Sequence, residues 1–337
     1  MVTKIITSGL PGISVVIPTY NRELFLEESI RSVLDQEGKF HLEIIISDDG
    51  STDKTMEIAR SFGPKVKIVT KPEGSKKQGV APTRNRGIEA ATQPYICFLD
   101  SDDFYLPGHL DKMVSALEAS PGLGFAFCRI LEIREENSKR LFRPWSHEHI
   151  FKNDIRNPVV SRSHIVHTNS FIFRRKVFEE VGCFNESYSN GEDGDQWMRI
   201  SEKFKGAFLE HFGVAYRTHH GAGQLTKNPS LQIKSCSLSI FENAKRRYYD
   251  LRLGDPNRIF KIEYNLLRFK YRNDDYPKTL YYRKYLGIIL RYPLGYAQKL
   301  RESHFEKKEK PLKAKWDFLD RYLSSNLNDQ PAGSAGK

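Results

Sequence analysis

The densest group of chemically competent side chains in this 337-residue chain is Asp100-Ser101-Asp102-Asp103, directly after the apolar run YICFL. Hard carboxylate oxygens suit Mg²⁺ or Mn²⁺, ions that keep several waters and complete their shells with phosphate oxygens. Such an ion stabilises the charge that develops on a departing diphosphate. Acidic turns after strands are also common without any function. A functional role for this motif therefore depends on where the motif lies in the fold.

A second group is Glu192-Asp193, at the expected start of a helix. A hydroxyl nucleophile needs a base, and a positioned carboxylate is the ordinary one. Helix capping is the alternative, because acidic residues in a first turn stabilise a helix without any catalytic role. A third group, Arg217 with His219 and His220, offers an imidazole for Mn²⁺ and a guanidinium for phosphate, although histidines are more often structural or exposed.

Positioning these groups requires a sheet. Short apolar, β-branched runs predict buried strands at residues 13–18, 43–47, 66–70 and 95–99. Helices are expected at residues 22–36, after residues 52–53 and at residues 82–91. This succession predicts an α/β fold whose mostly parallel sheet is flanked by helices and binds ligands outside the carboxyl ends of its strands. The sequence contains neither GxGxxG after the first strand nor GxxxxGK[ST], which argues against a dinucleotide dehydrogenase and a P-loop phosphotransferase.

The later part of this region shows weaker patterns. A helix beyond Leu106 and a further helix that ends near Gly182 are expected, with another helix from residue 191. Strands are predicted near residues 125–130, 170–173 and 213–215. The polar stretch at residues 132–162 has no clear periodicity and is interpreted as a loop region.

Seven segments in a fixed order closely resemble the family 2 glycosyltransferases of the GT-A fold. They are ISVVIPTYNR (13–22), EIIISDDGSTDKT (43–55), GVAPTRNRGIEAA (79–91), YICFLDSDD (95–103), VGCFNE (181–186), GEDGDQWMRI (191–200) and YRTHHGAGQLT (216–226). The resemblance covers about two thirds of the chain. No single segment is decisive, but the series in this order is highly specific.

The resemblance implies roles for these motifs. Asp193 would be the catalytic base, supported by Glu192, with Asp195 a less suited base. Asp49 would bind the edge of the nucleobase. Asp100 and Asp102 would form the DxD pair that touches the ribose and the metal. The expected nucleotide-sugar-binding residues are Pro18, Thr19, Tyr20, Arg22, Asp49, Arg84, Asn85, Asp100, Ser101 and Arg217. The expected metal ligands are Asp102, Asp103 and His219, with His220 as the alternative to His219.

The same resemblance implies an inverting hexosyl- or N-acetylhexosaminyltransferase that needs Mn²⁺ or Mg²⁺. It would use a nucleoside diphosphate sugar, with UDP as the leading expectation, and a glycan or lipid-linked acceptor in surface polysaccharide or glycoconjugate biosynthesis. Two alternatives come from other classes. A sugar-nucleotide nucleotidyltransferase would show a glycine-rich, basic signature near the first strand, and a non-catalytic sugar-nucleotide-binding scaffold would retain all three groups only by coincidence.

The charge distribution predicts the domain organisation. Residues 231–337 hold 23 of the 53 Lys and Arg residues but 12 of the 42 Asp and Glu residues, so the net charge of +11 belongs to this part. We expect an N-terminal extension at 1–12, a catalytic domain at 13–230, a basic, tyrosine-rich helical region at 231–323 and a disordered tail at 324–337. The basic region suits an anionic membrane surface or a helical appendage packed on the catalytic domain, and no motif supports nucleic-acid binding.

The expected location is the cytoplasm, at most peripheral on the membrane. No apolar run is long enough to span a bilayer, and the first eight residues lack the pattern of a signal peptide. Cys97, Cys128, Cys183 and Cys236 lie far apart and form no CxxC pair, which predicts reduced thiols and indicates neither a zinc site nor a disulfide framework. The sequence leaves the oligomeric state open.

Overall fold

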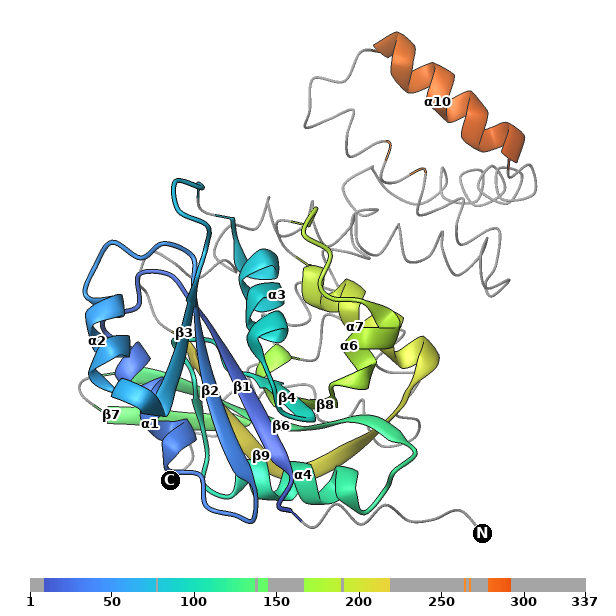
Figure 1. Cartoon of the computed structure of the whole chain (residues 1–337). Helices are drawn as coiled ribbons and strands as arrows, with labels where there is room; N and C mark the ends of the chain where they lie inside the picture. Colours follow the sequence, from blue (N-terminus) through green and yellow to red (C-terminus); the bar gives the residue numbers. More distant parts are fainter. Residues whose placement is uncertain are drawn as a thin grey trace, which may run out of the picture. The chain divides into compact units, whose positions relative to one another are not determined.

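The computed structural model describes residues 9–76, 78–136, 139–144, 167–188, 191–218 and 278–291, together with Tyr264 and Leu267. The chain divides into two compact units, Met1–Ile240 and Phe241–Lys337. The first unit contains one mixed sheet of nine strands in the order β3-β2-β1-β4-β8-β6-β9-β5, with β7 paired to β6 (Figure 1). The strands are β1 (Gly12–Thr19), β2 (His41–Asp48), β3 (Val66–Thr70), β4 (Tyr95–Phe98), β5 (Phe104–Tyr105), β6 (Leu123–Glu136), β7 (Lys139–Pro144), β8 (Phe171–Arg174) and β9 (Lys205–Thr218).

The first four strands form the parallel half of the sheet that the sequence predicts. β1 pairs in parallel with both β2 and β4, and β2 pairs in parallel with β3. Their carboxyl ends therefore lie along one edge, where the segments after β1, β2 and β4 can meet. The predicted α/β architecture with flanking helices is confirmed.

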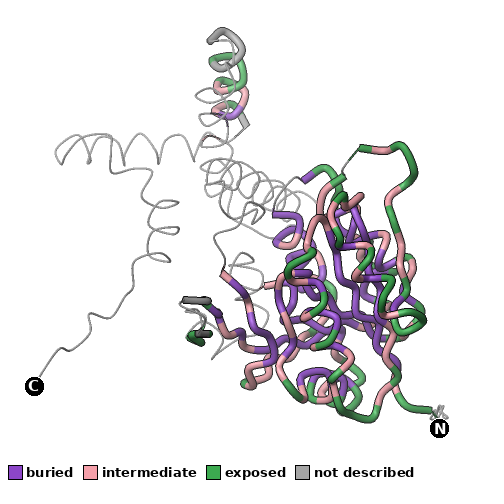
Figure 2. The backbone as a smooth tube through the Cα atoms, turned by 90° about the vertical axis from the view of Figure 1, so that its left-hand side faces the viewer, coloured by how far each residue is buried: buried purple, intermediate pink, exposed green. Residues whose placement is uncertain are grey.

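Helices cover both faces of this sheet because side chains alternate along its strands. Val15 and Ile17 of β1 pack in the core beneath α1, α2 and α4, whereas Val16 packs in the core beneath α3, α6 and α7. Figure 2 shows the buried residues concentrated in the strands and on the inner sides of the helices. The helices of this unit are α1 (Leu26–Leu34), α2 (Thr55–Ser61), α3 (Val80–Ala90), α4 (His109–Glu118), α6 (Lys176–Val181) and α7 (Glu192–Lys203), with 3-10 turns η1 (Gly63–Lys65) and η4 (Thr168–Ser170).

The second half of the sheet departs from the sequence prediction in two places. The predicted loop region at 132–162 is wrong for its first part, because β6 runs to residue 136 and forms an antiparallel hairpin with β7. The predicted strand at 213–215 is the last part of β9, a 14-residue strand parallel to β6. Glu132 of β6 accepts hydrogen bonds from Arg143 of β7 and from Thr218 of β9.

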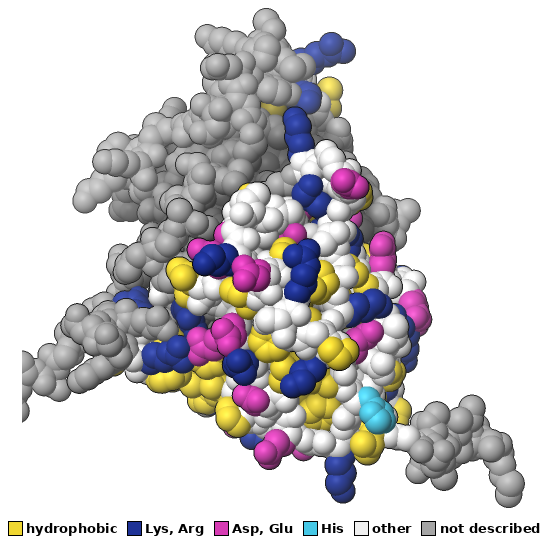
Figure 3. Space-filling model, turned by 60° about the vertical axis from the view of Figure 1, so that its left-hand side comes forward, with side chains coloured by type: hydrophobic (Ala, Val, Ile, Leu, Met, Phe, Trp, Pro, Cys, Tyr) yellow, Lys and Arg dark blue, Asp and Glu magenta, His cyan; other side chains and the backbone are white. Residues whose placement is uncertain are grey.

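The described surface of the first unit carries mixed charge. On the face shown in Figure 3, Lys and Arg side chains lie among Asp and Glu side chains. This agrees with the balanced charge of the chain before residue 231.

The second unit contains the helix α10 (Lys278–Arg291). In this helix Ile288 is buried, whereas Tyr282, Leu286 and Leu290 are exposed. None of the helices in the described ranges combines the length and the apolar character that a membrane crossing needs. The predicted tail at 324–337 lies outside the described residues.

Candidate functional site

The segments that follow β1 and β2 are locked together at the carboxyl edge of the sheet. Asn21 adopts a positive φ of 51°, a conformation that asparagine tolerates better than most residues. Its backbone N–H donates to Ser51 Oγ at 2.9 Å, and its side-chain oxygen accepts from the Thr52 N–H at 2.8 Å. The backbone N–H of Arg22 donates to Thr55 Oγ1 at 2.6 Å. These bonds give the edge of the site a fixed backbone.

Asp49 lies beneath this edge and is buried. Its carboxylate accepts backbone N–H bonds from Gln78 and Gly79 at 2.8–3.1 Å, and its own N–H donates to Thr19 O at 2.9 Å. The structure therefore brings Asp49 next to the end of β1, where the predicted residues Pro18, Thr19 and Tyr20 lie. In this structure both carboxylate oxygens of Asp49 are bound by backbone N–H groups.

The acidic segment after β4 is held by Asn169 of η4. Asn169 Oδ1 accepts from the Asp100 N–H at 3.0 Å, and its Nδ2 donates to Asp103 Oδ2 at 2.6 Å. The other oxygen of Asp103 accepts from the Arg217 N–H at 2.8 Å. Burial raises the pKa of Asp103 well above its ordinary value, and the negative charges of Asp102 and Asp100 add to this.

The members of this segment differ in exposure. Ser101 and Asp103 are buried, whereas the side chains of Asp100 and Asp102 are 26% and 15% exposed. Asp102 Oδ2 lies 3.4 Å from Arg22 Nε. The two carboxylates that a cation could approach from outside are therefore those of the predicted DxD pair.

Arg84 of α3 joins the acidic segment to the start of α7. Its Nη2 donates to Asp100 Oδ1 at 2.9 Å, and its Nη1 donates to Glu192 Oε1 at 2.8 Å. Burial alone lowers the pKa of Arg84, but the charges of Asp100 and Glu192 raise it above its ordinary value. The pKa of Glu192 is raised to about 7, mainly by burial. The negative charge of Asp193 also raises this pKa, and the positive charge of Arg84 lowers it. This buried bridge places two motifs that are 92 residues apart in one site.

The first turn of α7 carries three carboxylates with different partners. Glu192 is bound by Arg84, and Asp195 is bound by Arg199 Nε at 2.8 Å. Asp193 is partly exposed, and its Oδ1 accepts from the Gly194 N–H. Within the described ranges, no side chain donates a hydrogen bond to Asp193. Of the three, Asp193 is therefore the most exposed carboxylate and the one that no described arginine binds.

His167 is a site residue that the sequence prediction missed. Asp100, Asp103 and His167 each offer one ligand atom, and these three atoms lie within 4.8 Å of one another. Burial lowers the pKa of His167, while the carboxylates of Asp100 and Asp193 act in the opposite direction. Its ring also packs against Tyr216, with centroids 4.8 Å apart. His167 follows a segment without recognisable periodicity, so no sequence signal marked it.

Two further predicted nucleotide-sugar-binding residues have protein partners in this structure. Asn85 donates to Phe184 O at 2.9 Å and to Glu186, and its oxygen accepts from the Phe184 N–H. The guanidinium of Arg217 bonds to Glu28 at 2.6 Å and packs between two phenylalanine rings. Both side chains thus fix neighbouring segments, whatever contact they make with a ligand. His219 and His220 lie outside the described residues.

Comparison with known protein families identifies the family of this chain. The model of glycosyl transferase family 2 matches residues 14–182, which is half of the chain. The chain belongs to glycosyltransferase family 2. The acidic segment and Asp49 lie within the matched range, and α7 with Asp193 follows it.

Several curated glycosyltransferases are similar to this chain. An uncharacterized glycosyltransferase of Methanocaldococcus jannaschii is 30% identical over 210 residues, which cover 61% of this chain and 71% of the relative. One of Rickettsia conorii is 31% identical over 63% of this chain, but the match covers 35% of the relative. The chain thus spans about a third of the length of such Rickettsia relatives. The GalNAc(5)-diNAcBac-PP-undecaprenol beta-1,3-glucosyltransferase of Campylobacter jejuni is 28% identical over 80% of this chain and 79% of its own.

Solved structures show the same fold. Residues 1–349 of Staphylococcus aureus TarS, in complex with UDP-GlcNAc, align with a TM-score of 0.53 at 16% identity over 77% of this chain and 81% of that one. The mannosyltransferase PcManGT of Pyrobaculum calidifontis, in complex with GDP-Man and Mn²⁺, aligns with a TM-score of 0.54 at 16% identity over 96% of this chain and 88% of that one. This family 2 glycosyltransferase therefore has the GT-A fold, as predicted.

Proposed function

We propose that this family 2 glycosyltransferase moves a sugar from a UDP-sugar to a hydroxyl of a glycan or lipid-linked acceptor, with inversion and with the help of Mn²⁺ or Mg²⁺. The observation that carries the proposal is the buried Arg84 bridge between Asp100 and Glu192. It connects the acidic segment, suited to a cation and a diphosphate, to the helix start that offers a base. The UDP donor is supported by the complex of TarS with UDP-GlcNAc.

The donor atoms of the site fit a hard divalent cation. Asp100, Asp103 and His167 offer two carboxylates and an imidazole within 4.8 Å, and Asp102 is a further carboxylate of the same acidic segment. Oxygen-rich sets with one imidazole suit Mn²⁺, and Mg²⁺ accepts the carboxylates. Asp100 and Asp102 would hold the ion, with His167 and Asp103 as further ligands. When bound, it would neutralise the charge on the leaving diphosphate.

The acceptor side of the reaction would be served by Asp193. Its carboxylate takes the proton of the acceptor hydroxyl while the acceptor oxygen bonds to the anomeric carbon. The bond to the diphosphate oxygen breaks on the opposite face of the sugar, so the configuration inverts. Glu192, held by Arg84, fixes the helix start and thereby the position of Asp193.

Asp102→Asn is expected to weaken Mn²⁺ binding by more than about tenfold, because it removes a charged ligand and loss of an outer-shell partner alone typically costs about 10- to 100-fold. Isothermal titration of Mn²⁺ in the presence of UDP measures the change, and release of UDP from UDP-sugars should fall with it. Asp111→Asn is the matched control, since Asp111 lies on α4 and bonds to the Lys39 N–H. Equal Mn²⁺ affinity in wild type and Asp102→Asn would exclude Asp102 from the metal site.

We further propose that α10 contributes to binding an anionic membrane surface, which would bring the enzyme to a lipid-linked acceptor. Tyr282, Leu286 and Leu290 recur every four residues and are 56–74% exposed, and Arg283 and Lys284 are exposed on the same helix. Such a face suits the headgroup level, where each basic residue contributes about 1 kcal/mol. The similarity to the Campylobacter jejuni PP-undecaprenol glucosyltransferase supports a lipid-linked acceptor.

Replacing Leu286 and Leu290 together by Asp is expected to lower the affinity for phosphatidylglycerol vesicles roughly tenfold or more, since it removes apolar area and adds repulsion. Co-sedimentation with such vesicles measures the affinity. Leu24→Asp, at an 81% exposed leucine of the first unit, should leave binding unchanged. If the double variant sediments like wild type, α10 does not contact the membrane.

A further inference from the structure

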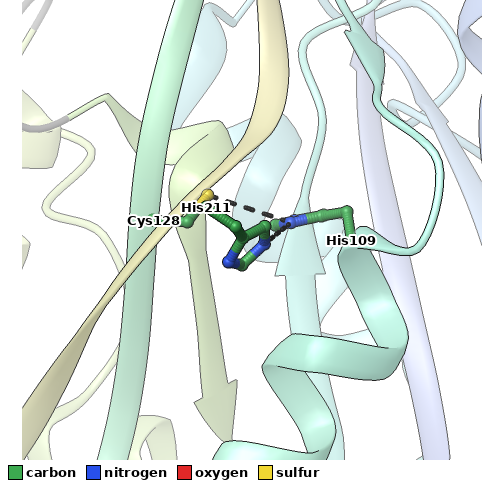
Figure 4. Close-up of side chains that lie close together, drawn as sticks. All are labelled: His109, Cys128 and His211. Atoms are coloured by element: carbon green, nitrogen blue, oxygen red, sulfur yellow. Dashed lines mark hydrogen bonds between the residues drawn. The ribbon is translucent and has the colours of Figure 1, made fainter.

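Three side chains with metal-ligating atoms meet on the face of the sheet covered by α4. His109 is the first residue of α4, Cys128 lies in β6 and His211 lies in β9 (Figure 4). His109 Nδ1 lies 3.3 Å from His211 Nε2 and 3.8 Å from Cys128 Sγ. One ligand atom from each residue lies within 4.8 Å of the other two. None of the three belongs to the site described above.

Irregular pairing between β6 and β9 brings these groups together. Cys128 pairs with Leu209 but Arg129 pairs with Phe212, so β9 has extra residues at the position of His211. Extra residues of this kind redirect side chains. A second shift leaves Gly213 opposite the cluster, where an added Cβ would lie 2.1 Å from His109 Nδ1 and 2.8 Å from Cys128 Sγ. The cluster therefore depends on a glycine at this position.

Two of the ligand separations agree with those around one tetrahedral ion. Zinc–nitrogen bonds of about 2.0–2.1 Å and zinc–sulfur bonds of about 2.3 Å place two nitrogens about 3.3 Å apart and a nitrogen about 3.6 Å from a sulfur. His109 Nδ1 lies 3.3 Å from His211 Nε2 and 3.8 Å from Cys128 Sγ, and the third pair, Cys128 with His211, lies within 4.8 Å. For the two pairs that include His109, an ion could be bound with movements of a few tenths of an ångström.

One nitrogen of His109 faces both other members of the cluster. His109 Nδ1 contacts His211 Nε2 and Cys128 Sγ, whereas the ring's other nitrogen, Nε2, is buried without a hydrogen-bond partner in the described part of the chain. His211 is partly exposed, which provides a route from solvent.

We propose that His109, Cys128 and His211 form a second metal site, which binds Zn²⁺ or a similar thiolate-binding cation through three protein ligands. Two imidazoles with a thiolate favour such ions over Mn²⁺ and Mg²⁺. The bound cation fastens β9 to β6 and α4. The same strand continues to Arg217, whose N–H holds Asp103, so the cation also braces the acidic segment. The cysteine spacing gave no sign of this site, because its ligands come from three separate elements.

Cobalt(II) titration of the metal-free full-length chain tests the proposal, with saturating Mn²⁺ present to fill the carboxylate site. We expect the near-ultraviolet absorption of a cobalt–thiolate bond. Cys128→Ser should abolish this absorption, and His211→Gln should weaken Co²⁺ binding at least tenfold. Cys183→Ser, at a partly exposed cysteine outside the cluster, should match wild type. Zn²⁺ should raise the melting temperature of wild type but not of Cys128→Ser.

Two further variants test the geometry and the charge around the cluster. Gly213→Ala keeps all three ligands but places a methyl group among them, so it should lose the cobalt–thiolate absorption. Lys112→Gln removes a positive charge that acts on both histidines and should raise Co²⁺ affinity several-fold. Absence of the thiolate absorption in wild type, or its persistence in Cys128→Ser, would overturn the proposal. If Cys128→Ser does not fold, unchanged Co²⁺ affinity in His211→Gln, a partly exposed position, has the same consequence.

Discussion

Asp193→Asn is expected to lower the turnover of sugar transfer by roughly 10²- to 10⁴-fold, the usual contribution of a general base. The amide has nearly the shape of the carboxylate but cannot accept the acceptor's proton. No described arginine binds Asp193, whereas its neighbours Glu192 and Asp195 are bound by arginines. Binding of UDP should stay within about twofold of wild type, because the proposed mechanism places Asp193 on the acceptor side. Release of UDP from a UDP-sugar in the presence of acceptor measures turnover.

Asp195→Asn is the matched control for this prediction, since it makes the same chemical change two residues further along α7. It breaks the pair with Arg199, which also donates to the backbone oxygens of Val181 and Cys183. We therefore expect lower stability but most of the turnover at a temperature where the variant stays folded. Wild-type turnover in Asp193→Asn, or a larger loss in Asp195→Asn, would remove Asp193 from the role of base.

Arg84→Met is expected to destabilise the first unit by about 3–5 kcal/mol, the cost of leaving buried charges without their partner. The arginine bonds to Asp100 and Glu192, and its side chain is 5% exposed. Urea denaturation measures the loss. Arg31→Ala is the matched control, because the Arg31–Glu27 pair on the surface of α1 contributes only about 0.2–0.5 kcal/mol.

The loss in Arg84→Met should depend on pH. Burial raises the pKa of Glu192 above its ordinary value even with Arg84 in place, and removal of the arginine raises this pKa further. A carboxyl group whose pKa is raised in the folded state destabilises that state increasingly as the pH rises above the pKa that the group has in the unfolded state. The deficit should therefore be smaller at pH 5 than at pH 8. Equal deficits would show that Glu192 does not carry the buried charge.

The parallel half of the fold was predictable because each strand is a short apolar run closed by a polar motif. The runs around Val15, Ile45 and Ile96 all became buried strands, and the motifs after them lie along one edge. The hairpin β6–β7 was not predictable, since its pairing rests on contacts of Glu132 that no alternation reveals. The length of β9 was missed because its first half, KGAFLEH, is only partly buried and shows no regular alternation of apolar and polar residues.

The candidate site was predictable in its residue types but not in its connections. The order of motifs identified the acidic segment and Asp193, because both follow recognisable patterns. Nothing in the sequence pairs Arg84 with Glu192, which is 108 residues away, or brings His167 beside Asp100. Such long-range pairs depend on how α3 and α7 pack on the sheet, which local patterns do not encode.

The central claim is that the diphosphate, the cation and the base share one site, and a crystal structure with UDP, acceptor analogue and Mn²⁺ tests it most directly. The account predicts an anomalous manganese peak bound by Asp102 and the diphosphate oxygens, with Asp193 on the opposite side of the donor's anomeric position. A manganese peak away from Asp100 and Asp102, or an Asp193 side chain directed at the diphosphate, would contradict it.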